Sequence, residues 1–266
     1  MPEGDTVYRV AAQLHEALAG QLLTRAELRV PAHATADLTG RQVLATVPRG
    51  KHLLTRIEGG LTLHTHLRMD GRWQLLRPGE PWTGGPAHQI RAVLATDSAV
   101  ALGYRLPVVQ LLGTDEESRV VGHLGPDLLG ADWDAVEALR RLAADPARPL
   151  GEALLDQRNL AGIGNVYANE LCFLASVTPW TPVGEVAVLE RLLARAQQLL
   201  ELNKLRPGHI TTGTTRPGRQ HWVYGQGRRQ CARCGSRIGV AEHDRERPAY
   251  WCPRCQRGPA PAPRRG

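Results

Sequence analysis

The sequence predicts an α+β protein built from several domains. Its first half alternates short apolar segments with Gly-rich turns, a pattern typical of an antiparallel β-sandwich. The second half carries apolar residues at helical spacing, and four cysteines near the end have the spacing of a zinc ribbon. We expect a sandwich domain over 1–125, a helical domain over 126–205, a basic zinc-finger region over 206–258 and a disordered tail over 259–266.

A helix near the start of the chain is expected to pack on the sandwich. Apolar residues follow the i, i+3, i+4, i+7 rule of a helix with one buried face; they are Val7, Val10, Ala11, Leu14, Ala17 and Leu18. We expect Asp5 or Thr6 to cap this helix and Gly20 to end it.

Short, partly alternating apolar runs predict the strands of the sandwich. They lie at 42–47, 52–57, 61–67, 73–76, 90–95, 99–104 and 108–112. The pairs Gly59-Gly60 and Asp70-Gly71 are expected to form hairpin-type turns. The Pro- and Gly-rich segment 77–88 is expected to form a loop. One helix on an antiparallel sandwich is therefore the predicted N-terminal domain.

Helices are predicted in the second half at 134–143, 150–156 and 186–200. Between the last two, Gly162-Ile163-Gly164 leads into a further helix that begins near Asn165. Glycine lets the backbone approach a phosphate group closely, and the first N–H groups of a helix bind anions. We expect Gly164 and Asn165 to bind phosphate, with Asn165 as helix cap or as donor. An ordinary tight turn is the alternative.

The four cysteines Cys231, Cys234, Cys252 and Cys255 form the pattern C-x2-C-x17-C-x2-C. Four thiolates complete the tetrahedral coordination of zinc and leave no open position. We therefore expect one structural Zn²⁺. Two disulfides are the alternative, and they require an oxidising compartment that nothing in the sequence indicates. Cys172 stands apart in an apolar helical stretch and is predicted to be a buried thiol.

Positive charge is concentrated in the last quarter of the chain. Residues 204–266 hold 14 Lys and Arg and 3 Asp and Glu, a net charge of +11. The whole chain has a net charge of +7, so the remainder is slightly acidic. This asymmetry indicates a polyanionic partner such as nucleic acid. The ribbon arginines are the expected contacts: Arg228, Arg229, Arg233, Arg237, Arg245, Arg247, Arg254 and Arg257.

The chain begins Met1-Pro2-Glu3, and a small second residue permits removal of the initiator methionine. Pro2 would then carry a secondary amine, which forms an iminium ion with a sugar C1′ or an aldehyde. Glu3 is a carboxyl that moves protons at the same centre. A start without chemical meaning is the alternative. No run of about 18 apolar residues and no secretion signal is found, so we expect a cytoplasmic protein with no membrane contact.

Four sequence features occur together and in order: Met1-Pro2-Glu3-Gly4-Asp5, Arg49-Gly50-Lys51, the segment 162–168, and the ribbon ending Cys255-Gln256-Arg257. This set resembles the formamidopyrimidine-DNA glycosylase/endonuclease VIII family of base-excision repair enzymes. The resemblance implies a β-sandwich, a helix–two-turn–helix domain and a zinc finger. It also implies a bifunctional glycosylase/AP lyase that attacks damaged DNA through Pro2 and cuts the backbone by β,δ-elimination.

The resemblance also assigns roles to individual residues. Lys51 matches a strand lysine near the sugar and phosphate, and Arg257 matches a finger arginine that grips phosphate. Asn165 matches a phosphate-binding asparagine. Met69 falls where the family fills the hole left by a flipped base, although a core or turn methionine is the alternative. We expect a monomer associated with the nucleoid and without an organic cofactor.

Two departures from the family pattern bear on the lesion. The segment Tyr104-Arg105-Leu106-Pro107-Val108 lacks the Pro-Arg-Arg-Phe-Gly stretch of the purine-directed enzymes, and 209–216 is too short for the loop that caps 8-oxoguanine. Both departures favour the endonuclease VIII branch and oxidised pyrimidines, whereas Met69 resembles the purine branch. The alternatives are an 8-oxoguanine/formamidopyrimidine glycosylase, a catalytically silent damage-binding protein, and a zinc-ribbon partner of transcription or translation machinery.

Overall fold

The computed structural model describes residues 2–243 and 247–261. The chain folds as two compact units, residues 1–123 and 124–266, and each is described by itself. Arg245 and most of the predicted disordered tail lie outside the described residues. The finer division of the chain into a sandwich, a helical domain and a zinc-finger region stays a prediction.

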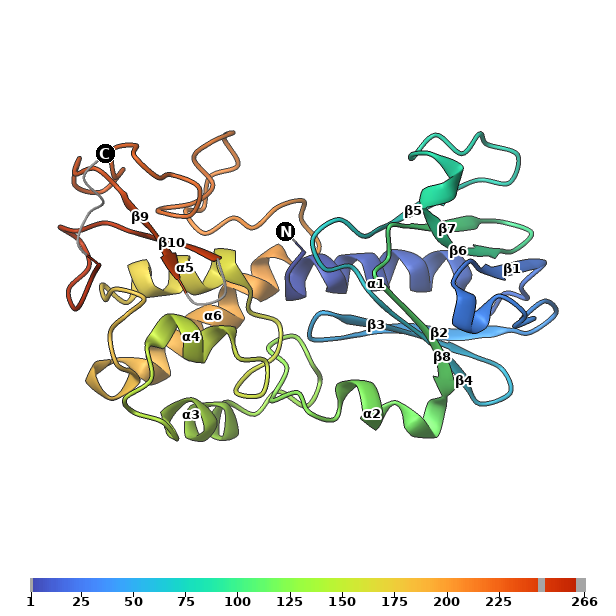
Figure 1. Cartoon of the computed structure of the whole chain (residues 1–266), viewed down its shortest axis with the longest axis horizontal. Coiled ribbons are helices and arrows are strands. Elements are labelled where there is room, and N and C mark those ends of the chain that lie inside the picture. The colour runs from blue at the N-terminus through green and yellow to red at the C-terminus, as the bar shows by residue number, and fades with distance from the viewer. Residues whose placement is uncertain (1, 244–246, 262–266) are drawn as a thin grey trace. The chain divides into compact units, whose positions relative to one another are not determined.

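The N-terminal unit is a β-sandwich with a helix, α1 (Gly4–Leu18), beside it (Figure 1). Its strands are β1 (Arg25–Leu28), β2 (Val43–Arg49), β3 (His52–Ile57), β4 (Leu61–His66), β5 (Arg72–Leu76), β6 (Ile90–Ala95), β7 (Val100–Tyr104) and β8 (Val108–Gly113). They form two antiparallel four-stranded sheets, in the orders β1-β6-β7-β5 and β2-β3-β4-β8. A short helix, α2 (Ser118–Val121), follows the last strand.

Apolar side chains from α1 and both sheets form the core of this unit. Val7, Leu14, Leu53, Leu63 and Leu94 are buried in it together. The predicted bounds of β3 and β6 are confirmed, and the other predicted strands differ by one or two residues. Strand β1 was not predicted, because its Arg-Ala-Glu-Leu sequence carries little apolar alternation.

Two local predictions for this unit are wrong. Helix α1 begins at Gly4 with Glu3 as its N-cap residue, and the Glu3 side chain makes no capping hydrogen bond. Asp5 lies inside the first turn, where its Oδ1 accepts the N–H of Thr6 at 2.6 Å. Asp70-Gly71 is not a hairpin turn. It leads from one sheet to the other, because β4 pairs with β3 and β8 whereas β5 pairs with β7.

The C-terminal unit joins a helical layer to a small hairpin (Figure 1). Its helices are α3 (Ala135–Ala143), α4 (Leu150–Leu155), α5 (Asn165–Leu174) and α6 (Leu189–Asn203), and its strands are β9 (Gly239–His243) and β10 (Arg247–Trp251). Asp134 caps α3 by accepting the N–H groups of Val136 and Glu137. Helix α5 is buried on nearly every side, and Cys172 lies in the core as predicted. No helix in the described part of the chain is long and apolar enough to cross a membrane.

A buried carboxylate attaches the segment before the ribbon to α5. Glu170 is fully buried, and it accepts the backbone N–H groups of residues 222, 223 and 224, each at 2.8 Å. The hydroxyl of Thr211 donates to the same carboxylate. Hydrogen bonds to a buried charged group offset its desolvation and are stronger than neutral ones. Glu170 therefore holds both ends of the loop between Thr211 and Trp222 in place.

Candidate functional site

Four cysteines meet at one end of the C-terminal unit. Their Sγ atoms all lie within 4.8 Å of one another, with Cys231 and Cys255 at 4.0 Å and Cys234 and Cys252 at 3.4 Å. Four sulfurs about 2.3 Å from a tetrahedral ion are separated by roughly 3.8 Å, so the cluster fits a metal ion. All four thiols are free, and the disulfide alternative is not found.

Two tight knuckles bring these thiols together. In the first, Gly235 has a φ of 78°, and its N–H donates to the carbonyl of Cys231 at 2.8 Å. In the second, the N–H of Gln256 donates to the carbonyl of Cys252 at 3.0 Å. The left-handed conformation at position 235 favours glycine because a Cβ is strained there. The knuckle sequences therefore determine the cluster geometry.

The second knuckle also positions Arg257. Its N–H donates to the carbonyl of Ser176 and its own carbonyl accepts the N–H of Thr178, both at 2.9 Å. The Arg257 side chain itself is exposed. A cation on a backbone fixed from both sides suits recognition of a phosphate at a defined place.

The turn before α5 is held by Gln157. Its side chain accepts the N–H of Gly162 at 3.1 Å and donates to the carbonyl of Ile163 at 2.9 Å. Gly164 is the N-cap residue of α5. The prediction that Asn165 caps the helix is therefore wrong, because Asn165 is its first residue and its side-chain amide donates to the carbonyl of Pro248 in β10 at 2.9 Å.

Asn169 makes the second link between α5 and β10. Its Oδ1 accepts the N–H of Tyr250 at 2.6 Å, and its amide donates to the backbone carbonyl of Asn165 at 2.7 Å. Both asparagines are buried. The candidate phosphate-binding turn and the ribbon hairpin are thus parts of one hydrogen-bonded assembly.

One ribbon arginine has a packing role. The guanidinium of Arg233 lies 4.3 Å from the ring centre of Phe173 and 5.2 Å from that of Trp222. The two rings are stacked with their centres 5.5 Å apart. Cation–π contacts of this kind stabilise a fold. Arg233 therefore contributes to attaching the first knuckle to α5.

One end of the N-terminal sandwich gathers positive charge. At this end His52 of β3 pairs with His66 of β4, and Arg72 of β5 pairs with Tyr104 of β7. Three connections therefore share this end: the β2–β3 turn, the segment 67–71 and the segment 105–107. Their cations, with those of the adjoining strand ends, are Arg49, Lys51, Arg68, Arg72 and Arg105. Such a cluster suits a polyanion.

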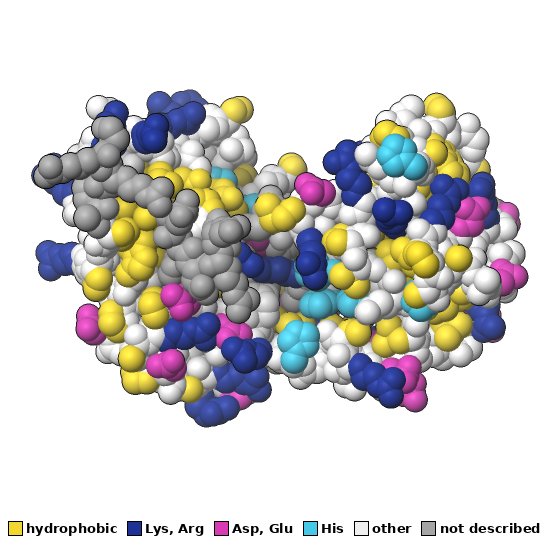
Figure 2. Space-filling model, viewed as in Figure 1, with side chains coloured by type: hydrophobic (Ala, Val, Ile, Leu, Met, Phe, Trp, Pro, Cys, Tyr) yellow, Lys and Arg dark blue, Asp and Glu magenta, His cyan; other side chains and the backbone are white. Residues whose placement is uncertain are grey.

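Three histidines lie at the same end, on β3 and β4. Burial, together with the charges of nearby histidines and Lys51, lowers the pKa of His52 to about 3 and that of His66 to about 4. Burial also lowers the pKa of His64. These rings are neutral near pH 7. In the space-filling view, one group of histidine side chains lies beside Lys and Arg side chains near the middle of the picture, and other histidine side chains lie apart from it (Figure 2).

The candidate nucleophile lies at the start of α1. Pro2 is partly exposed and directly precedes Glu3, whose side chain is fully buried. The carbonyl of Glu3 accepts the N–H of Val7 at 3.0 Å, which is the first hydrogen bond of the helix. Pro2, which adjoins Glu3, is therefore attached to a rigid element, as a positioned nucleophile requires.

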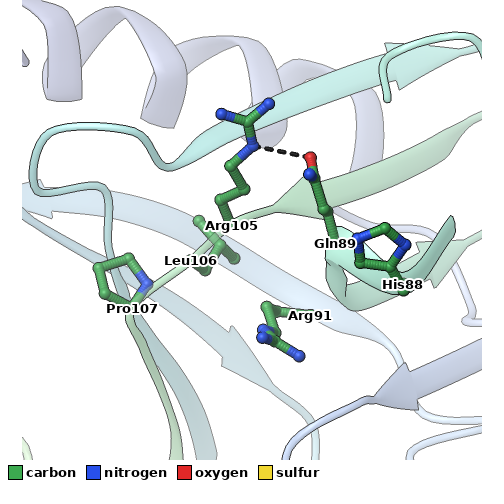
Figure 3. A pocket seen from close by; sticks show the side chains of 6 residues that line it. All are labelled: His88, Gln89, Arg91, Arg105, Leu106 and Pro107. Atoms are coloured by element: carbon green, nitrogen blue, oxygen red, sulfur yellow. Dashed lines mark hydrogen bonds between the residues drawn. The ribbon is translucent and has the colours of Figure 1, made fainter. Parts of the chain in front are cut away.

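Met69 is 63% exposed on the turn between β4 and β5. The alternative of a core methionine is therefore excluded, and a turn methionine remains. A second exposed feature is a cavity of about 350 Å³, lined by His88, Gln89, Arg91, Arg105, Leu106 and Pro107 (Figure 3). Arg105 has a φ of 48° and donates from Nε to Gln89 Oε1 at 2.7 Å.

Sequence reasoning missed the histidine group and the buried anchors Glu170 and Asn169. A signal for the histidines was present, because His64 and His66 alternate on one strand and so share a face. Their partnership with His52 depends on strand register, which single-sequence patterns do not provide. The anchors had no local signal, since their partners are about 50 to 80 residues away.

Comparison with known proteins agrees with this geometry. A model of the formamidopyrimidine-DNA glycosylase N-terminal domain matches residues 1–105, and one of the formamidopyrimidine-DNA glycosylase H2TH domain matches residues 124–210. The chain is 62% identical, over 99% of its length and 96% of the relative's, to probable endonuclease 8 2 of Streptomyces coelicolor. It is 47% identical, over 96% of its length and 99% of the relative's, to the DNA-(apurinic or apyrimidinic site) lyase Nei2 of Mycolicibacterium smegmatis.

A solved structure shows the same fold. The complex of Lactococcus lactis Fpg with abasic-site DNA matches with a TM-score of 0.81 at 22% identity, covering 97% of this chain and 100% of that one. Fold, cysteine cluster and relatives together define a DNA glycosylase with AP lyase activity, an enzyme of base excision repair. The chain belongs to the formamidopyrimidine-DNA glycosylase/endonuclease VIII family and to its endonuclease VIII-like branch. The resemblance found in the sequence is confirmed.

Proposed function

We propose that this enzyme removes oxidised pyrimidines from DNA with the Pro2 amine as its nucleophile. The observation that carries the proposal is the start of the chain, where Pro2 adjoins the buried carboxyl of Glu3 at the first turn of α1. Helix α1 packs in the core of the N-terminal unit, so both groups are attached to a rigid element. In a member of this family, that arrangement supports attack on a sugar.

The amine attacks C1′, and the bond from C1′ to the damaged base breaks as the base leaves with its electron pair. A proton supplied through Glu3 opens the sugar ring, and the resulting iminium accepts electrons when a proton leaves C2′. Elimination then breaks the C3′–O bond, and a second elimination breaks the C5′–O bond. Water hydrolyses the remaining imine and regenerates the amine.

Positively charged and amide groups bind the substrate in this proposal. Lys51 and Arg257 contact phosphates, the Gly164–Asn165 turn binds a phosphate at the start of α5, and Met69 fills the space left by the flipped base. Zn²⁺ is the ion proposed for Cys231, Cys234, Cys252 and Cys255, because four thiolates at tetrahedral spacing are a structural zinc site. The ion holds the ribbon and takes no part in the reaction.

The preference for pyrimidines rests on the short connection between β7 and β8. It comprises Arg105-Leu106-Pro107 only, which leaves no room for the Pro-Arg-Arg-Phe-Gly stretch that the purine-directed enzymes carry. Relatives named endonuclease 8 support the same branch. We further propose that the enzyme acts as a monomer at the cytoplasmic nucleoid and uses no organic cofactor.

Borohydride trapping tests the proposal directly. Duplexes carry an abasic site, thymine glycol, 5-hydroxyuracil, dihydrouracil or 8-oxoguanine, and wild type is compared with Pro2→Gly. We expect a covalent adduct that is strongest with oxidised pyrimidines and falls to background in Pro2→Gly, while duplex affinity is retained. Preference for 8-oxoguanine would instead support the other branch. Full trapping by Pro2→Gly would show that another residue is the nucleophile.

A further inference from the structure

The turn that exposes Met69 is held in a strained shape. Arg68 has a φ of 45°, a left-handed conformation that costs a non-glycine residue energy and persists only where its surroundings impose it. The N–H of Gly71 closes the turn on the carbonyl of Leu67 at 2.8 Å. A Cβ at position 71 would lie 2.5 Å from that carbonyl oxygen, so the turn requires glycine there.

One side chain binds the backbone of Arg68. The N–H of Arg68 donates to Nδ1 of His66 at 2.9 Å. A side-chain acceptor that takes the N–H two residues later is the geometry of an Asx turn, which asparagine and aspartate normally supply. His66 supplies it here, and it does so only while Nδ1 carries no proton.

The neighbouring histidines hold the His66 ring in place. His64 Nδ1 donates to Gln110 Oε1 at 3.0 Å, which leaves its Nε2 as the acceptor for His52 Nδ1 at 2.8 Å. The His52 ring meets the His66 ring edge-on, with centres 4.9 Å apart. A chain of hydrogen bonds from β8 to β3 thus orients the ring against which His66 packs.

We propose that His66 is a positioning residue for Met69, because its ring acceptor holds Arg68 left-handed and so keeps Met69 at the exposed apex of the turn. The consequence for catalysis rests on the proposed function, in which Met69 enters the DNA. The partly buried histidine group thus shapes the turn that carries Met69 before DNA binds.

Conservative variants separate this role from mere packing. The Oδ1 of asparagine occupies the position of His Nδ1, so His66→Asn retains the acceptor and completes a true Asx turn. The amide of glutamine reaches the position of Nε2 instead, so His66→Gln loses the acceptor although it preserves a polar side chain of similar length. Circular dichroism and thermal unfolding establish that both variants are folded.

Met69 itself reports the outcome. The sequence has two methionines, Met1 and Met69, so the full chain labelled with [¹³C-methyl]methionine gives one signal once Met1 is removed, and Met69→Leu assigns it. We expect His66→Asn to keep the wild-type methyl shift and line width. In His66→Gln the signal should move to the random-coil position and sharpen. A wild-type signal in folded His66→Gln, or a random-coil signal in folded His66→Asn, would overturn the proposal.

Trapping kinetics then connect the turn to repair. On 5-hydroxyuracil duplex, His66→Gln should lower kcat/KM by the same factor as Met69→Ala, whereas His66→Asn should stay near wild type. The double variant His66→Gln/Met69→Ala should have a kcat/KM no lower than that of either single variant. If Met69→Ala has no effect, the role of Met69 in the proposed function fails, while the methyl signals still decide whether His66 positions it.

Discussion

The two units present their cations by different means. In the N-terminal unit, Lys51 and Arg68 lie beside neutral, buried or partly buried histidines, of which His52 and His64 are joined by a hydrogen bond between their rings. In the C-terminal unit, Arg257 is positioned by backbone hydrogen bonds next to a four-cysteine cluster. The first arrangement depends on the protonation state of imidazoles, and the second on four thiols that are spaced to hold a metal ion.

This difference separates the conditions that should damage each unit. Neutral histidines make the sandwich end sensitive to acid, whereas a thiolate cluster makes the ribbon sensitive to chelation. The helical layer and the ribbon also share the anchors Glu170 and Asn169, so loss of the ion is expected to spread from the ribbon to α5. The sandwich has its own core, and it should survive that loss.

The largest expected effect is loss of the ribbon when the proposed zinc ion is removed. Structural zinc contributes on the order of 10 kcal/mol to folding of such modules. Treatment with a strong chelator, or Cys252→Ser, should therefore unfold the ribbon and abolish duplex binding. The N-terminal unit should remain folded. Hydrogen exchange of the β10 and β4 amides, with metal content measured in parallel, checks this expectation.

Cys172→Ala is the matched control for that experiment. Cys172 is a buried cysteine outside the cluster, and burial raises the pKa of its thiol. This variant should keep its full metal content and its duplex binding. If Cys252→Ser bound DNA as tightly as wild type, the ribbon would not be part of the interface.

The next effect in size is loss of sandwich stability in acid. His52 and His66 have pKa values of about 3 and about 4 in the folded chain, against an unfolded value of 6.5. Between the folded and unfolded pKa values, the unfolded chain thus binds more protons than the folded chain. The contribution of the neutral rings to the free energy of unfolding is therefore full above pH 6.5, and it falls as the pH approaches 4. Each histidine contributes about 1.36 kcal/mol for each pH unit in this window.

Unfolding in urea from pH 7.5 to 4, monitored on the N-terminal unit, measures that slope. Charged and titratable groups around the pair are Lys51, Arg68, His64 and His123. His52→Phe removes one titrating ring and should flatten the slope, whereas His88→Phe, at an exposed position, should leave it unchanged. Equal slopes in wild type and His52→Phe would contradict the neutral-histidine interpretation.

The sequence predicted what local patterns encode. The alternation in β3 and β6 and the cysteine spacing are readable within a few residues, and both were located correctly. Pairing between distant segments is not readable in this way. Asp70-Gly71 has the composition of a hairpin turn, but strand order decides that it leads between two sheets. Residue identity therefore predicted a turn and could not predict its topology.

The site shows the same limit. The four cysteines were located because their spacing is local, whereas the roles of Pro2 and Glu3 stay predictions. Asn165 was expected to cap the helix or to donate to phosphate, whereas its amide donates to a carbonyl in a strand 83 residues further along. The histidine group was missed because its acceptor chain crosses three strands. Tertiary contacts assign these polar side chains their partners, and composition alone does not.

The smallest expected effect distinguishes packing from DNA contact within the ribbon. Arg233 and Arg254 are both exposed, but Arg233 lies over the Phe173–Trp222 stack. Arg233→Ala should lower the free energy of unfolding by about 1 kcal/mol, with little change in how duplex affinity depends on salt. Arg254→Ala should leave stability unchanged and reduce the salt slope by about 1. Arg233→Lys retains the charge but stacks poorly, so it should lose part of the stability and none of the salt slope. A salt slope that fell equally in Arg233→Ala and Arg254→Ala would mean that both arginines contact phosphate, and that charge in the ribbon is not divided between packing and binding.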